Sequence, residues 1–257
     1  MKYRRFVPLI APLLIWLFDQ AFLFAPVFFY SSLALGALVI VISVKLIASR
    51  GEKKYWPLFV ILPLLFFLSF STYVTIIVSS FWIQLIFLLI AWFLYAYLKY
   101  LYYLVGNQSA LENSGELENK IDSLLNVGGF LTSYALAAVL FGLTAFLNWS
   151  PELMLPAFAL IIWLLFLQFL PFKRISWRRT GGLLIINVLA LTELAWIFSL
   201  FPLNFNILAL FSALTYYLSL TIIHAYWRGN LNRQTLKTPL ILSAIIIIFS
   251  LLIARWL

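Results

Sequence analysis

The sequence alternates between long apolar segments and short polar ones, and this pattern predicts a bundle of membrane-spanning helices. A helix that crosses a bilayer needs about 20 predominantly apolar residues. Backbone N–H and C=O groups find no water inside lipid, so a helix, which pairs these groups internally, is the expected structure for each such segment. Nine segments qualify: 6–24, 26–48, 57–78, 82–105, 124–147, 153–171, 181–201, 205–226 and 238–257.

The composition supports the same class of protein. Hydrophobic residues make up 65% of the 257 positions and charged residues 10%, whereas soluble domains have about 45–50% and about 25%. A soluble fold with this composition would expose apolar patches that promote aggregation, but lipid solvates such a surface. We therefore expect an all-α, polytopic membrane helix bundle in which residues 1–257 form a single integral-membrane domain.

The positions of the basic residues predict how the bundle is oriented. If all nine segments span the membrane, every lysine and arginine except Arg255 lies on the same side as the N-terminus. The positive-inside rule then predicts a cytoplasmic N-terminus and an external C-terminus. The residues at 21–26 make a poor signal-peptide cleavage site, so the first segment is expected to stay as an anchor in a bacterial-type plasma (inner) membrane.

The formal net charge of +9 does not indicate a nucleic-acid-binding protein. The basic residues occur in short clusters between apolar segments, where they set membrane orientation. No basic and aromatic face is available to follow a phosphate backbone. The partners expected from this pattern are membrane lipids, and no nucleic acid.

One longer polar segment, residues 106–123, separates the fourth and fifth spans. It divides the domain into two predicted halves, 1–105 and 124–257. The simpler interpretation is a hydrated cytoplasmic linker. Its acidic character contrasts with the basic loops on either side, so the alternative is a docking site for a basic protein partner.

Two carboxyl groups are predicted to lie inside the membrane, where an ionisable side chain costs about 2.5–3.5 kcal/mol at the centre of a helix. Glu193 is expected about 12 Å below the outer end of the seventh helix, and Asp19 about 8 Å below the outer end of the first. Glu193 either serves a site or is protonated or hydrogen-bonded as a structural group, and Asp19 either serves a site or reaches up to the outer interface. The two groups can share a proton if their helices pack together, and Arg255, the single outer cation, can neutralise either one.

The remaining chemistry is sparse. The chain has no cysteine and one histidine, which excludes disulfides, thiolate metal sites and cysteine nucleophiles. His224 is predicted at the opposite membrane face from both carboxyl groups, so we expect no metal site and no cofactor. Motifs of soluble enzymes, such as a phosphate-binding loop or a zinc-binding His-Glu-x-x-His, do not occur in the sequence.

The function expected from the sequence is non-enzymatic: a transport-type protein, or an accessory or assembly subunit of a membrane complex. Its candidate polar residues are Glu193, Asp19 and Arg255, all in the outer leaflet. The alternative is a membrane-embedded enzyme that acts on a lipid or lipid-linked substrate, with Glu193 as acid or base.

The orientation can be tested by introducing single cysteines, because the chain has no native ones. A membrane-impermeant maleimide should label intact cells at positions 80, 152 and 203. It should label only permeabilised cells at positions 52, 115, 176 and 231. Labelling at 52 or 176 in intact cells would contradict the predicted orientation.

Overall fold

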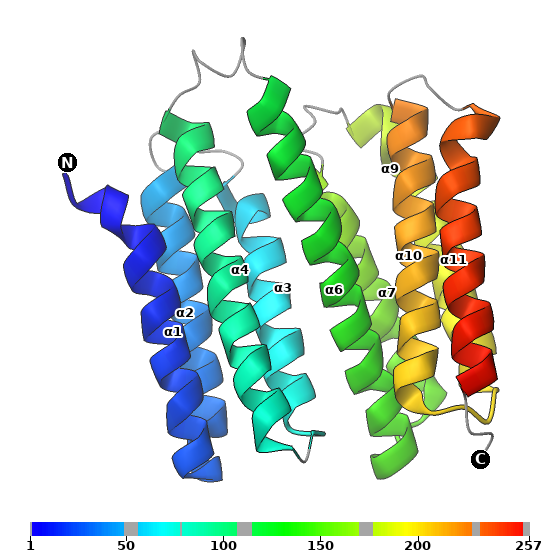
Figure 1. Cartoon of the computed structure of the whole chain (residues 1–257), viewed down its shortest axis with the longest axis horizontal. Coiled ribbons are helices and arrows are strands. Elements are labelled where there is room, and N and C mark those ends of the chain that lie inside the picture. Colours follow the sequence, from blue (N-terminus) through cyan, green and yellow to red (C-terminus); the bar gives the residue numbers. More distant parts are fainter. Residues whose placement is uncertain are drawn as a thin grey trace. The chain divides into compact units, whose positions relative to one another are not determined.

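The computed structural model describes residues 2–48, 56–77, 79–106, 115–169, 177–227 and 232–253, and these are almost entirely helical. The prediction of an all-α fold is confirmed (Figure 1). Two short 3-10 helices, η1 (Lys2–Phe6) and η2 (Pro26–Phe28), accompany the α-helices. The α-helices are α1 (Val7–Phe24), α2 (Phe29–Ala48), α3 (Trp56–Val74), α4 (Ser80–Gly106), α6 (Gly115–Leu147), α7 (Pro151–Leu167), α9 (Trp177–Ser199), α10 (Phe205–Trp227) and α11 (Arg233–Ile253).

Among the described residues, seven helices are long and apolar enough to cross a membrane: α1, α2, α3, α4, α6, α9 and α10. Shorter apolar helical segments occur in α7 (Glu152–Leu167) and α11 (Lys237–Leu252). The spans predicted at 153–171 and 238–257 both extend into residues outside the described ranges. The architecture is that of a multi-pass integral membrane protein.

Helix α6 begins earlier than the sequence analysis predicted. Residues 115–123, which were expected to belong to a hydrated linker, form the first turns of this helix. Ile121 and Leu125 are buried, so the apolar helical pattern continues backwards into the polar segment. Residues 107–114 lie outside the described ranges, as does much of the predicted docking site for a basic partner.

The chain divides into two compact units, Met1–Gly129 and Phe130–Leu257, and the division falls within α6. In the first unit α1 packs against α2 and α4, and α3 also packs against α2 and α4. The rings of Phe66 and Phe93 stack with their centroids 3.9 Å apart and connect α3 to α4. Both rings are fully or almost fully buried, so this contact lies in the core of the unit.

In the second unit, the helices pack in the order α7, α9, α10 and α11. α9 and α11 both pack against α10, and α9 also packs against α7. Aromatic contacts connect α10 to three neighbours: Phe130–Tyr217 to α6, Phe166–Tyr216 to α7 and Phe198–Phe211 to α9, with ring centroids 6.3, 5.4 and 5.9 Å apart. The fully buried Tyr216 lies near the middle of this helix.

The turn between α9 and α10 is short and ordered by its own polar groups. The side-chain Oδ1 of Asn204 accepts a hydrogen bond from the backbone N–H of Asn206 at 2.9 Å, which caps the first turn of α10. The backbone N–H of Leu203 donates to the carbonyl oxygen of Phe201 at 2.8 Å. The turn therefore holds the end of α9 beside the start of α10.

Three glycines test whether the helices pack as described. A Cβ atom at Gly128 would lie 2.5 Å from Cζ of Phe93, and one at Gly36 would lie 2.3 Å from Cζ of Phe67, whereas one at Gly182 would meet nothing within 4 Å. Gly128→Ala and Gly36→Ala should each destabilise the protein by about 1–3 kcal/mol because the buried rings must move. Gly182→Ala should be neutral or stabilising, since alanine is the better helix former by about 1 kcal/mol.

The measurement is the midpoint of thermal unfolding of the purified protein in detergent. The Gly128 and Gly36 variants should unfold at a lower temperature than the parent, and the Gly182 variant should not. Equal midpoints for all three variants would contradict the packing of α2 on α3 and of α6 on α3 and α4.

Candidate functional site

The rotation of α9 about its axis is set by the face that packs on α7 and α10. Its buried residues recur every three or four positions and so form one stripe along the helix: Thr180, Leu184, Val188, Leu191 and Ala195. Burial of this stripe leaves the opposite side of the helix uncovered.

The uncovered side of α9 carries a second regular stripe. Nine residues between 182 and 200 are exposed, and Ile185, Ala190 and Ile197 flank the stripe. The other six recur at alternating intervals of four and three and end one residue beyond α9: Gly182, Ile186, Leu189, Glu193, Trp196 and Leu200. We call these six residues the α9 seam. All except Glu193 are apolar, as expected for a surface that faces lipid.

Glu193 therefore lies on the outside of the second unit and not in its core. It precedes the last residue of α9, Ser199, by six residues, which places it about 9 Å from that end of the helix. No described residue donates a hydrogen bond to its carboxylate. A glutamate hydrogen-bonded to a neighbouring group, one of the predicted alternatives, does not fit this position. Arg255, which was predicted as a cation able to neutralise either Glu193 or Asp19, lies outside the described residues.

The other polar groups on the same stretch of α9 are already satisfied. Thr192 donates a hydrogen bond to the carbonyl oxygen of Val188 at 2.7 Å, and Ser199 donates to that of Trp196 at 2.6 Å. The side-chain amide of Asn187 donates to the carbonyl oxygen of Leu183 at 2.8 Å. These contacts stay within the helix, so Glu193 is the polar group that α9 presents to its surroundings.

Asp19 lies in the first unit, and its environment is the reverse of that of Glu193. It is only 3% exposed, and it shares the buried face of α1 with Ala11 and Ile15. No described residue donates a hydrogen bond to its Oδ2 atom, and the indole Nε1 of Trp16, one turn earlier, is also buried without an acceptor. Asp19 does not reach up to the interface, because neighbouring helices cover it.

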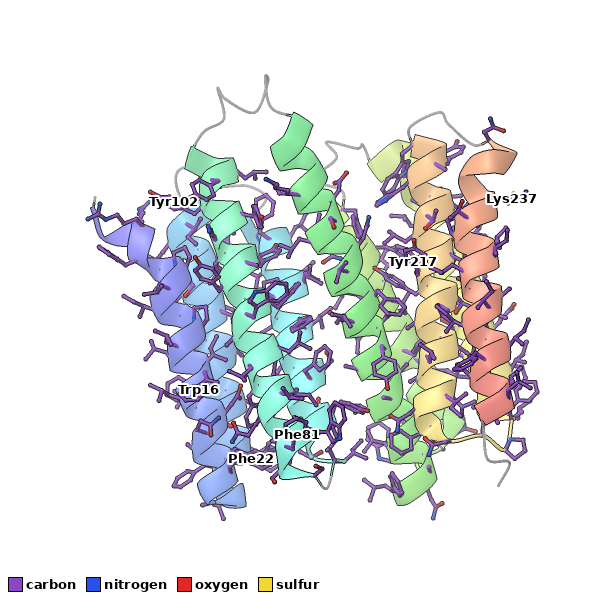
Figure 2. All side chains as sticks on the ribbon, in the orientation of Figure 1. Trp16, Phe22, Phe81, Tyr102, Tyr217 and Lys237 are labelled. Carbon is purple, nitrogen blue, oxygen red and sulfur yellow. The ribbon has the colours of Figure 1, made fainter. Side chains whose placement is uncertain are left out.

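A hydrogen-bonded pair of glutamines lies beside this carboxyl group. The side-chain amide of Gln20 donates to Oε1 of Gln84 at 3.0 Å, and the amide of Gln84 donates to Oε1 of Gln20 at 3.1 Å. This reciprocal pair fastens α1 to α4. Phe22 and Phe81, which are close to the two glutamines in sequence, lie toward the same end of the unit (Figure 2).

The glutamine pair was not predicted, although the sequence contains a signal for it. Gln20 precedes the last residue of α1 by four positions, and Gln84 follows the first residue of α4 by four. In antiparallel neighbours these positions lie at the same depth. Two amides at equal depth in apolar spans are expected to pair, because each would otherwise lie unsatisfied in hydrocarbon.

The described residues offer little for metal chemistry. No group of three or more His, Cys, Asp or Glu side chains among them could hold a metal ion. His224 packs against the rings of Phe169 and Trp227, with centroids 5.1 and 5.6 Å apart. It lies three residues before the end of α10, and Glu193 lies near the opposite end of that hairpin.

Comparisons of this chain with protein-family models, with curated proteins and with solved structures each found no match. The candidate functional residues thus rest on the sequence and the structure, and they form two separate features. One is an exposed carboxylate on the α9 seam, and the other is a buried carboxyl group beside the glutamine pair in the first unit.

The coupling free energy between Gln20 and Gln84 can be measured by a double-mutant cycle. Gln84→Leu leaves the amide of Gln20 unsatisfied in an apolar environment and should lower the unfolding midpoint, and Gln20→Leu should do the same. The double variant should recover part of the loss, with a coupling on the order of 0.6–2 kcal/mol.

Ser71→Ala provides the control for this cycle, because the buried Oγ of Ser71 has no hydrogen-bond partner. Its removal should leave the midpoint unchanged. Additive losses in the double glutamine variant would show that the two amides do not interact.

Proposed function

We propose that this protein is a non-enzymatic accessory subunit of a membrane complex. One observation carries the proposal: the carboxylate of Glu193 lies on the outward face of α9, inside a membrane-spanning segment. A carboxylate that faces lipid is costly, and a protein partner that covers it removes much of that cost. The exposed position of Glu193 is thus best explained by a surface that another subunit completes.

The alternative of a membrane-embedded enzyme has less support. A general acid or base must be held within hydrogen-bond reach of its substrate, with other groups that position the reacting atoms. On the seam, the neighbours of Glu193 are Leu189 and Trp196, and the indole N–H of Trp196 is a donor that can act neither as acid nor as base. If Glu193 were nevertheless the acid or base of a reaction on a lipid-linked substrate, Glu193→Gln would abolish turnover and leave the complex intact.

A transport role is a second candidate, and the burial of Asp19 favours it. An acceptor oxygen without a hydrogen-bond donor, 97% buried between helices, is typical of groups that bind a proton or a cation. A cation that binds there would stabilise the folded protein. This role predicts that replacing choline with sodium raises the unfolding midpoint of the parent but not that of Asp19→Asn. The accessory role predicts equal midpoints in both salts.

The proposal includes an orientation. With a cytoplasmic N-terminus, the lysines and arginines of the loops face the cytoplasm and Glu193 lies in the outer half of a bacterial-type plasma membrane. The distribution of basic residues along the sequence supports this arrangement.

The accessory function is tested by isolating the tagged chain from its native membrane in polymer-bounded lipid discs and determining the mass and stoichiometry of what is recovered. We expect a second integral membrane protein in a fixed ratio to the chain. Replacing residues 107–114 with a glycine–serine linker should leave this ratio unchanged, because the contact is expected within the membrane. A chain recovered alone with lipid would contradict the proposal.

A further inference from the structure

The spacing of the α9 seam is that of a helix–helix contact. Its residues recur at intervals of four, three, four, three and four, which is the heptad spacing of the two core positions of a coiled coil. Left-handed pairs of membrane helices pack with the same geometry. The seam covers 18 residue steps from Gly182 to Leu200, or about 27 Å, which is close to the thickness of the hydrocarbon core. A single spanning helix can therefore lie along its whole length.

Within the second unit, no described residue packs against Gly182. A Cβ atom there would meet nothing within 4 Å, whereas at Gly36 and Gly128 it would collide with a buried ring. Glycine costs about 1 kcal/mol relative to alanine inside a helix. Small residues at the contact surface let a second membrane helix approach closely. Close approach of a partner helix therefore explains a glycine at position 182, which no contact within its own unit explains.

Glu193 occupies one position of the seam, and its neighbours there are apolar. In helix pairs, a single polar residue at a core position selects the partner and fixes the register of the two helices. A carboxylate in this position requires a donor opposite, and a lysine or arginine provides both charge and hydrogen bonds, at about 2.7–2.9 Å. Thr192 and Ser199 donate to their own helix, and no described group, the indole N–H of Trp196 included, donates to Glu193. A cationic donor for this carboxylate therefore has to come from outside α9.

A second copy of this chain does not provide such a donor from its described helices. Lys45 lies near the end of α2, Lys99 lies in the second half of α4 and Lys120 lies in the second turn of α6. The other described basic residues lie in η1 or in the first two turns of α9 and α11: Lys2, Arg4, Arg5, Arg178, Arg179, Arg233 and Lys237. Under the proposed orientation, all ten lie toward the cytoplasmic face, away from the depth of Glu193. The helix that covers the seam is therefore expected to belong to a different protein.

On the basis of the accessory function proposed above, we infer that the α9 seam binds one transmembrane helix of a different protein. This helix carries a lysine or arginine at the depth of Glu193 and packs closely against Gly182. The contact removes the carboxylate from lipid and sets the register of the two helices.

The test uses the full-length chain in native lipid discs and two seam variants, Gly182→Leu, which blocks close approach, and Glu193→Leu, which removes the charge. Recovery of the second membrane protein should fall about tenfold or more in each. Two matched controls should retain it. Ala244→Leu adds the same bulk on the exposed face of α11, and Glu152→Gln removes an exposed carboxylate at the start of α7. None of the four purified variants should unfold at a lower temperature than the parent, and Gly182→Leu can unfold at a higher one because leucine is the better helix former.

A charge exchange then identifies the contact. Glu193→Lys should abolish recovery, and replacing one lysine or arginine in the partner's transmembrane helix with glutamate should restore it. Retention of the partner by both seam variants would overturn the inference while leaving the accessory function in place. A parent chain that recovers no second membrane protein would overturn the accessory function itself. Restoration by Arg255→Glu in this chain would show that its own C-terminal segment, or that of a second copy, occupies the seam.

Discussion

The hydrocarbon interior of the membrane offers no hydrogen bonds, so each polar side chain in a spanning helix must find its partner within protein. Most of them do so locally. Thr192 bonds to a carbonyl oxygen of its own helix, and Gln20 and Gln84 bond to each other across two helices. Several buried groups depart from this pattern, among them both amide atoms of Gln168 and the hydroxyl of Ser71. The two carboxyl groups are the departures that carry an acid: Oδ2 of Asp19 is enclosed without a donor, and Glu193 faces outwards. The functional proposals follow from these two departures.

The fold was largely predictable because membrane spans are long and apolar, and the length of an apolar segment is directly visible in a sequence. The start of α6 was not predictable, because residues 115–123 combine charged residues with Ile121, and this combination also fits a hydrated linker. Only the burial of Ile121 and Leu125 shows that the helical face begins there. Similarly, the turn between α3 and α4 begins after Val74, earlier than the predicted span at 57–78 suggests.

For the candidate site, the sequence predicted how far along its helix each carboxyl group lies. It did not predict in which direction around the helix axis the side chain points. The position of Glu193 near one end of α9 follows from counting residues. Which way it points depends on the contacts of Leu184, Leu191 and Ala195 with neighbouring helices. In a helix that is apolar on all sides, no amphipathic pattern reveals that choice. The same ambiguity explains why the sequence left open whether Asp19 serves a site or reaches up to the interface; in the structure its side of α1 is covered.

The central claim is that residue 193 faces lipid in the isolated chain and a partner helix in the native complex. The most direct test is the oxygen accessibility of a spin label attached to a single cysteine at position 193, with position 191, which is 2% exposed, as the buried reference. The account predicts that in the isolated chain the label at 193 is far more accessible to oxygen than the label at 191, and that this accessibility falls in the native complex. Equal, low accessibility at both positions in the isolated chain would contradict it.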